Sequence, residues 1–283
     1  MNTILKGSFK EITISTDGPV IIIGESINPT RRKKLVETLS KYDFTFVHEL
    51  ARSQIDEGAD VLDINVGFPG VEDEKLLPET VISIQNEFDI PLCIDSPNPK
   101  AIDAALKVTK GKCLINSVNG EEKSLNSILP IAKEYGAAVI GLTMDDNGIT
   151  HEPEKRLQVA EKILERAIKS GIPQEDVVID PLTMAVSADT NAGIVTLETT
   201  KMVRDKLGLN ITMGASNVSF GLPNRVVLNN VFMAMAIYNG LTCPIANPGK
   251  ITASVRSADL LLGHDDYSIR YVEYYQSNLK SNS

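Results

Sequence analysis

Histidine and cysteine are scarce in this sequence, with three of each among 283 residues. The histidines stand in an expected helix, a loop and the C-terminal tail, at His48, His151 and His264. A protein-bound metal centre with histidine ligands is therefore not expected, since such a centre needs several ligands close together. The cysteines are odd in number and lie in separate apolar runs. We expect them to be buried reduced thiols, which favours a cytosolic protein.

The sequence also lacks an excess of positive charge and any long apolar run. It has 28 Lys and Arg against 37 Asp and Glu, a formal net charge of −9. This balance argues against binding to nucleic acid or to an anionic membrane, both of which select clustered positive charge. No apolar run approaches the roughly 20 residues that cross a bilayer, and the N-terminus has no signal-peptide pattern. The composition is otherwise that of an ordinary globular protein, and we expect a single domain over residues 1–283.

What the sequence does contain is a repeated pattern of a short apolar run, a polar end and a helical stretch. Eight runs have this character: VIIIGE, ADVLDIN, IPLCIDS, KCLINS, AAVIGLT, DVVIDP, LNITMG and LTCPIAN. Helical spacing occupies residues 44–57, 72–87, 99–108, 121–135, 153–170, 194–207, 225–239 and 250–262. Strands that are apolar throughout are buried on both faces, so the pattern predicts an α/β fold, a (β/α)8 TIM barrel over about residues 20–262. A doubly wound open sheet is the alternative.

Three segments flank or interrupt this pattern. Alternation over residues 8–23, with a turn at 16–19, predicts an N-terminal β-hairpin whose second arm becomes the first barrel strand. The C-terminal tail to residue 283 should fray after Tyr274, where the sequence becomes QSNLKSNS. The basic run at residues 31–34 is interpreted as a helix start or a solvated face.

Polar side chains stand at the end of every predicted strand. In a TIM barrel these ends converge on one mouth, where the chemistry takes place. A single Asp or Asn at such a position is more often a helix cap, but eight polar ends together favour a binding site. Three aspartates and two asparagines, Asp63, Asp95, Asp180, Asn116 and Asn217, suit a neutral planar heterocycle that is rich in N–H donors.

The loop over residues 213–225, MGASNVSFGLPNR, follows the seventh predicted strand. Gly214, Ala215 and Ser216 are small enough for a flat ligand to approach the backbone, and Asn217 offers both a donor and an acceptor. Taken alone, the same letters also fit a plain turn with a helix cap.

Several of these strings together resemble a known family. IIIGESIN, LDINVG, CIDS, INS, GLTMDDNGI, IDPL and SNVSFGLPNR occur here in the order and at the separations of the pterin-binding, dihydropteroate synthase-like barrels. Within that family the chain most resembles the methyltetrahydrofolate:corrinoid protein methyltransferases, and it is similar to the folate domain of cobalamin-dependent methionine synthase. The resemblance covers roughly residues 20–262.

The resemblance implies a role for each candidate residue. Asp95, Asn116 and Asp180 would hold the pyrimidine edge of the pterin, with Asp63 beside them. In the loop over residues 213–225, Ser216 and Asn217 would contact the substrate, and Asn217 would act catalytically at nitrogen 5, which carries the methyl group. Arg225 matches the arginine that the family has in this loop, and it is carried over as a substrate-binding residue.

The resemblance also implies the cofactor and the partners. Tetrahydrofolate or 5-methyltetrahydrofolate would be the substrate, and the methyl group would move to or from the cobalt of a corrinoid. The sequence has no corrinoid-binding DxHxxG motif, so the corrinoid is expected on a separate protein that docks transiently. A homodimer is a further expectation from the family.

Two other functions stay open from the sequence. A dihydropteroate synthase would carry an ESTRPG-like loop after the second strand and an SRK segment after the seventh. This chain has NVGFPG and SNVS there, and so lacks the Arg and Lys that would bind a pyrophosphate leaving group. A folate-binding module without catalysis is the third possibility.

Overall fold

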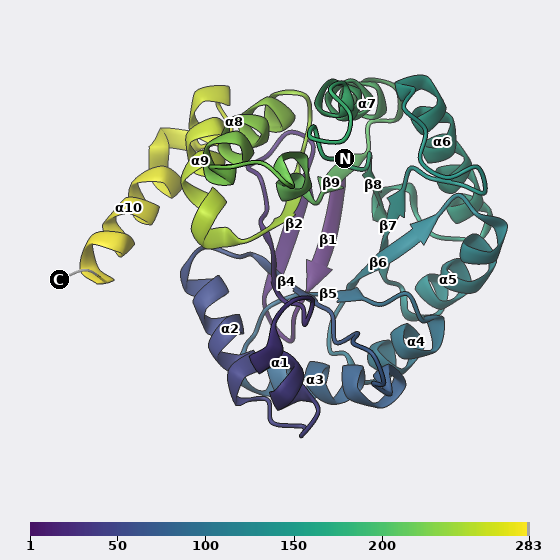
Figure 1. Cartoon of the computed structure of the whole chain (residues 1–283), viewed down its shortest axis with the longest axis vertical. Coiled ribbons are helices and arrows are strands. Elements are labelled where there is room, and N and C mark those ends of the chain that lie inside the picture. The colour runs from purple at the N-terminus through teal and green to yellow at the C-terminus, as the bar shows by residue number, and fades with distance from the viewer. Residues whose placement is uncertain (282–283) are drawn as a thin grey trace.

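A computed structural model describes residues 1–281 and has a closed barrel of eight parallel strands at its centre (Figure 1). The barrel strands are β3 (Ile23–Ile27), β4 (Val61–Ile64), β5 (Leu92–Asp95), β6 (Leu114–Asn119), β7 (Ala138–Leu142), β8 (Val177–Asp180), β9 (Asn210–Met213) and β10 (Cys243–Ala246). The last strand, β10, pairs in parallel with both β9 and β3, which closes the sheet on itself. The predicted TIM barrel is confirmed, and the open doubly wound sheet is excluded.

A ring of helices surrounds the barrel, one after each strand. They are α2 (Thr45–Asp56), α3 (Asp73–Glu87), α4 (Pro99–Val108), α5 (Glu122–Tyr135), α6 (Pro153–Lys169), α7 (Ala192–Leu207), α8 (Arg225–Tyr238) and α9 (Pro248–Leu262). Local sequence sets their ends: the Asn98 side chain accepts the backbone N–H of Lys100 at the start of α4, and Gly208 ends α7 in the left-handed conformation. Helix α1 (Lys33–Leu39), between β3 and α2, is additional to the eight predicted helices, and it begins within the basic run that was interpreted as a helix start or a solvated face.

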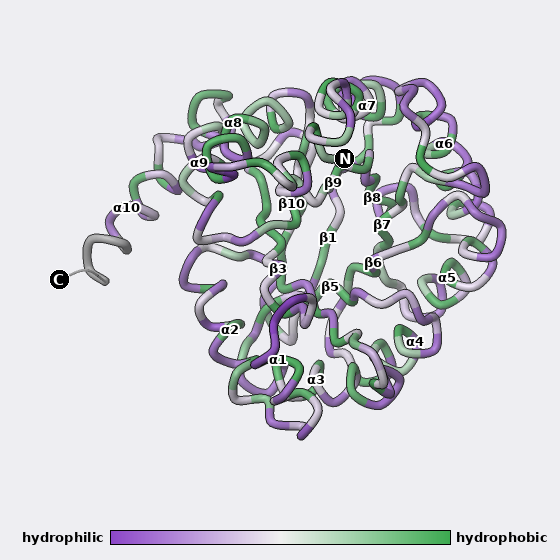
Figure 2. Tube along the Cα trace, viewed as in Figure 1, coloured by the Kyte–Doolittle hydropathy of each residue, from purple (hydrophilic) through white to green (hydrophobic). Residues whose placement is uncertain are grey.

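Apolar side chains fill the inside of the barrel and the layer between barrel and helices. The strands are apolar along most of their length, as the green stretches in Figure 2 show. Ile23, Val61 and Ile140 belong to the cluster inside the barrel, and Ile22, Leu62 and Val139 belong to the larger cluster beneath the helices. Neighbouring residues of each strand thus face opposite ways, and both faces are covered. The three cysteines are buried and free, as predicted.

An antiparallel hairpin of β1 (Asn2–Lys6) and β2 (Glu11–Ser15) precedes the barrel. Leu5 and Ile14 are fully buried in the cluster inside the barrel, and Asn210, at the start of β9, donates to the Ile14 carbonyl at 2.9 Å. The hairpin therefore closes the barrel at the end where the strands begin. A hairpin was predicted, but its bounds of 8–23 were wrong. The hairpin turn lies at residues 7–10, and residues 16–22 connect to β3, because the core of the barrel takes the apolar run that follows Pro19.

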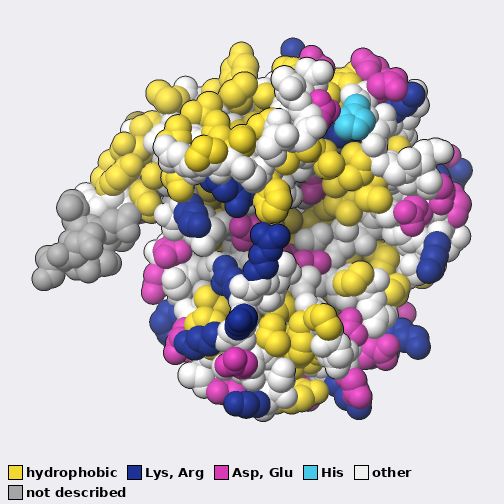
Figure 3. All heavy atoms as spheres, in the orientation of Figure 1, with side chains coloured by type: hydrophobic (Ala, Val, Ile, Leu, Met, Phe, Trp, Pro, Cys, Tyr) yellow, Lys and Arg dark blue, Asp and Glu magenta, His cyan; other side chains and the backbone are white. Residues whose placement is uncertain are grey.

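Helix α8 presents an uncovered apolar face. Val227, Val231, Met235 and Tyr238 recur at helical spacing, and between 47% and 69% of each side chain is exposed. The only charged residue of this helix is Arg225 at its first position. Hydrophobic side chains gather over the α8, α9 and α10 region at the upper left of Figure 3.

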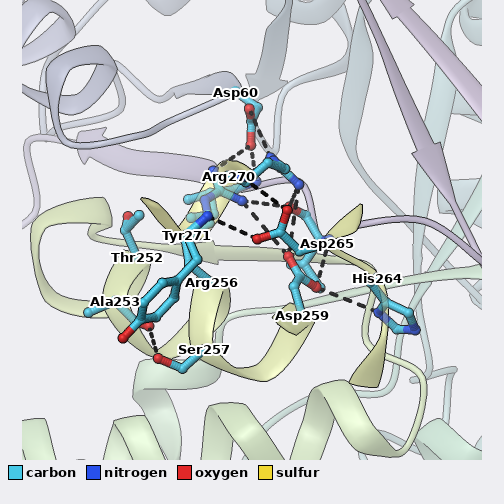
Figure 4. A network of polar contacts seen from close by, with 12 residues as sticks. Asp60, Thr252, Ala253, Arg256, Ser257, Asp259, His264, Asp265, Arg270 and Tyr271 are labelled. Carbon is cyan, nitrogen blue, oxygen red and sulfur yellow. Dashed lines mark hydrogen bonds and ion pairs between the residues drawn. The ribbon is translucent and has the colours of Figure 1, made fainter. Parts of the chain in front are cut away.

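The last helix, α10 (Ile269–Ser281), is held to the barrel by a network of charged side chains (Figure 4). Asp265 accepts two backbone N–H groups from the first turn of α10, at 2.9 and 3.0 Å. Arg270 of α10 approaches Asp60 and Asp259, each at 3.8 Å, and the buried Asp259 accepts the backbone N–H of Val20 at 3.1 Å. The predicted fraying after Tyr274 was therefore wrong up to residue 281, and residues 282–283 lie outside the described residues.

Within residues 1–281, the structure contains no helix that is both long enough and apolar enough to cross a membrane.

Candidate functional site

The ends of β3, β4, β5 and β6 surround a hollow of about 260 Å³ at the mouth of the barrel. Its lining residues are Glu25, Asn28, Thr30, Arg32, Asp63, Asp95, Asn116 and Ile245. The structure thus brings together three of the residues that the sequence singled out, from three adjacent strands. This is possible because parallel strands of a barrel end at the same rim.

Carboxylate and amide side chains in this hollow are bonded to one another. The amide of Asn116 donates to Asp63 at 3.2 Å, and the amide of Asn65 donates to Asp95 at 2.9 Å. Each amide thereby fixes the orientation of one carboxyl group. Asp95 keeps a second oxygen, Oδ1, that accepts no hydrogen bond from residues 1–281, so it remains available to a ligand. We call Asp63, Asn65, Asp95 and Asn116 the acidic wall.

Burial makes the acidic wall hard to ionise. Burial, and then the negative charge of Asp95, raises the pKa of Asp63 from 3.8 to about 8. Burial also raises the pKa of Asp95, against the effect of the hydrogen bond from Asn65. Because two adjacent buried carboxylates repel, we expect the pair to retain a proton near neutral pH and to release its protons stepwise.

Asp180 lies on β8, on the opposite side of the barrel mouth from β4. It is only 8% exposed, and burial raises its pKa to about 7, although the backbone N–H of Leu182 donates to it at 2.7 Å. The positive charge of the buried Arg156 lowers this pKa in part. Asp180 makes no hydrogen bond to the acidic wall within residues 1–281, and because β8 lies opposite β4 a ligand in contact with both would reach across the mouth.

Asn217 and Arg225 lie in the segment between β9 and α8, which contains the short 3-10 helix η2 (Ala215–Ser219). Asn217 is exposed, and its side-chain amide makes no hydrogen bond to any residue among 1–281. Arg225 instead donates to the carbonyl of Ser216 at 2.7 Å and to the hydroxyl of Ser219 at 3.0 Å. Arg225 therefore fixes the backbone on which Asn217 stands, and two of its donors are already used within the protein. We call residues 214–225 the amide loop.

Comparison with known proteins agrees with this geometry. The model of the pterin binding enzyme family matches residues 24–247. The chain belongs to this family. A methylcorrinoid:tetrahydrofolate methyltransferase of Eubacterium limosum is 30% identical over 266 residues, covering 91% of this chain and 96% of that protein. The predicted resemblance to the methyltetrahydrofolate:corrinoid methyltransferases is therefore confirmed.

Two further comparisons place this pterin-binding chain more broadly. The methionine synthase of Mycobacterium tuberculosis is 30% identical over 259 residues, covering 86% of this chain, but the chain spans only 22% of that protein. Among solved structures, a dihydropteroate synthase of Yersinia pestis with a pterine–sulfa conjugate has a TM-score of 0.70 at 14% identity, covering 92% of this chain and 99% of that one. At that identity the likeness shows a shared fold.

The structure adds two residues to the candidate site of this pterin-binding protein: Glu25, a strand-end residue whose role the sequence leaves open, and Arg32, which the sequence does not single out. Glu25 lines the hollow and accepts the backbone N–H of Asn247, and burial raises its pKa against the lowering effect of the nearby charge of Arg32. Arg32 also lines the hollow and donates to the Ser26 carbonyl at 2.7 Å. The sequence contains a signal for Arg32, because the basic run at residues 31–34 begins four residues after the last residue of β3. The interpretation of that run as a helix start is also correct in part, since α1 begins at Lys33.

Proposed function

We propose that this protein transfers a methyl group between nitrogen 5 of tetrahydrofolate and the cobalt of a corrinoid carried by a separate protein. The observation that carries the proposal is the pairing, across one barrel mouth, of the buried acidic wall with the exposed, unbonded amide of Asn217. The relative from Eubacterium limosum, whose name gives the same two reactants, supports it. The cytosol is the expected location.

The acidic wall and Asp180 suit the pyrimidine edge of a pterin. That edge carries adjacent N–H donors, and a carboxyl oxygen such as Oδ1 of Asp95 can accept one of them. Asn116 would meet a ring acceptor or donor beside it, while Asp180 would contact the ring from across the mouth. Burial of these groups strengthens each hydrogen bond because it excludes water.

Asn217 would act at nitrogen 5. A tertiary amine releases a methyl group slowly unless its nitrogen gains positive charge, and an amide oxygen can accept a hydrogen bond from that nitrogen once it is protonated. By rotating, the same amide can donate to the neutral nitrogen, so Asn217 serves the reaction in both directions. Arg225 would position Asn217 through Ser216. The corrinoid, when docked at the mouth, supplies the cobalt that accepts or gives the methyl group.

We further propose that the protein forms a homodimer through the apolar face of α8. Isolated apolar side chains on a surface are common, but a continuous stripe without charge marks an interface. A second copy is favoured because a two-fold axis would pair this stripe with itself.

Val231→Glu should shift the protein to a monomer in sedimentation velocity. Ile168→Glu, at an equally exposed position on α6, should leave the mass unchanged.

Mixing the protein with 5-methyltetrahydrofolate and reduced free cobalamin tests the catalytic proposal directly. We expect the absorption spectrum of Co(I) to change to that of methyl-Co(III) at a rate proportional to protein concentration. Folate binding without this change would instead favour a non-catalytic folate-binding module. Incorporation of p-aminobenzoate into a pterin product would favour a dihydropteroate synthase, and either result would overturn the proposal.

A further inference from the structure

A second hollow adjoins the proposed folate site. It has a volume of about 700 Å³ and lies between the segment after β3 and the segment after β4. Its lining residues are Pro29, Thr30, Arg31, Arg32, Lys33, Val36, Glu37, Gly67, Phe68 and Pro69. Thr30 and Arg32 line both this hollow and the smaller one at the acidic wall, so the two hollows adjoin each other. We call the larger one the basic groove.

The basic groove has the opposite charge to the site that it adjoins. Three cations line it and Glu37 is its one carboxylate, although the whole chain has a net charge of −9. Arg31 and Lys33 are exposed and form no ion pair within residues 1–281, whereas the next basic residue, Lys34, pairs with Glu49. Lys and Arg side chains gather beside the central opening, over the α1 region, in Figure 3. Unpaired cations beside a hollow favour an anionic ligand.

The groove also reaches the amide loop. The guanidinium of Arg31 lies 5.5 Å from the centre of the Phe220 ring, which belongs to that loop. Arg32 donates through one nitrogen to the Ser26 carbonyl, whereas the side chains of Arg31 and Lys33 make no hydrogen bond or ion pair within residues 1–281. Phe68, Pro69 and Val36 also line the groove and supply an apolar surface beside these cations. A ligand that leaves the acidic wall past Thr30 would therefore meet both apolar side chains and two cations that have no ion-pair partner within residues 1–281.

We propose that the basic groove binds the anionic tail of the folate and selects folates that carry several glutamates. The inference rests on the proposed function, because it takes a tetrahydrofolate to be the substrate. The substrate has a neutral pterin at one end and a benzoyl-glutamate with carboxylates at the other. Its charge distribution therefore matches a mouth with an acidic wall on one side and a basic groove on the other. Each added γ-linked glutamate brings one more carboxylate to Arg31 and Lys33.

Equilibrium binding of two folates tests the proposal without reference to activity. Tetrahydropteroyl monoglutamate and triglutamate would be titrated by calorimetry into the wild type, the double variant Arg31→Glu/Lys33→Glu, and a control, Lys110→Glu/Lys201→Glu. The control changes the net charge equally at two exposed lysines that do not lie at strand ends, since Lys110 precedes β6 and Lys201 lies within α7. We expect the wild type and the control to bind triglutamate about fivefold tighter, a ratio typical of one or two exposed ion pairs. The ratio should shrink as salt is raised, and it should vanish in the groove variant.

Two results would overturn the proposal. The wild type could bind both folates equally, or Arg31→Glu/Lys33→Glu could keep the wild-type ratio. If the variant that keeps the ratio also slows methyl transfer to a corrinoid protein but not to free cobalamin, the groove is assigned to the protein partner instead. Failure of the wild type to bind either folate would overturn the proposed function itself. If the charge reversal prevents folding, the milder variant Arg31→Gln/Lys33→Gln replaces it. This variant should also lower the ratio toward one.

Discussion

The two sides of the barrel mouth are built in opposite ways. The acidic wall is buried, lies on strands, and its side chains are bonded to one another at 2.9 and 3.2 Å. The amide loop lies beyond the end of β9, and Asn217 on it is exposed with an unbonded amide. The wall therefore has a fixed shape before any ligand arrives, whereas the amide of Asn217 can still rotate.

This difference suggests a division of labour. Recognition of a flat ring requires donors and acceptors at fixed positions, which rigid strand ends provide. Assistance to a nitrogen whose charge changes requires a group that can either donate or accept, which a free amide provides. The predictions below test whether binding and turnover separate along this line.

The largest expected effect comes from the amide loop. Asn217→Ala should lower kcat for methyl transfer to free cobalamin by about 10²-fold, which is typical for loss of one donor or acceptor to a developing charge. The Kd for tetrahydrofolate should change by less than about threefold. Stopped-flow absorbance gives kcat and calorimetry gives Kd. Equal losses in both would mean that Asn217 only binds the substrate.

The acidic wall should show the reverse pattern. Asp95→Ala removes the carboxylate that has a free oxygen, and we expect the Kd for tetrahydrofolate to rise by about 30-fold, the cost of one charged hydrogen bond. At saturating folate, kcat should stay within about threefold of the wild type. Asp95→Asn keeps the shape and one acceptor, so its Kd should fall between the two. A Kd unaffected by Asp95→Ala would remove the wall from the binding site.

A smaller effect is expected where the loop is held in place. Arg225→Lys keeps the charge but cannot bond both Ser216 and Ser219 with one planar group, so Asn217 should be less well positioned. We expect kcat to fall about tenfold with little change in Kd, since small misplacement of a reacting group is costly. A larger rise in Kd than fall in kcat would show that Arg225 contacts the substrate directly, as the sequence resemblance implied.

A last prediction concerns stability in the absence of ligand. With a pKa of about 8 against an ordinary 3.8, folded Asp63 keeps a proton that the unfolded chain loses between these values. The contribution of Asp63 to the free energy of unfolding should therefore be greatest below about pH 4. It should fall as the pH rises to about 8. Asp63→Asn should flatten the dependence of Tm on pH between 5 and 9. The exposed Asp146→Asn should leave the wild-type slope, and an unchanged slope in Asp63→Asn would contradict the assignment.

The strands and most helices could be predicted because each has a local cause. All eight apolar runs became barrel strands, and the eight predicted helices start and end within a few residues of the observed ones. The hairpin bounds failed because residues 20–22 could extend either a hairpin arm or the first barrel strand, and only barrel closure decides between them. Helix α10 was missed because its polar sequence is held by Asp60, Asp259 and Asp265, which are distant or unremarkable in the chain.

The sequence by itself determined that this protein is an α/β barrel with carboxylates and amides at its strand ends, because periodicity and strand-end chemistry are local properties. Only the tertiary structure decided that Asp63 and Asp95 share a buried wall, that Arg225 is used to hold the amide loop, and that Arg31 and Lys33 border a groove that adjoins the site. The physical reason is that burial, hydrogen-bond partners and the sharing of charge depend on distances between strands, and barrel closure sets those distances.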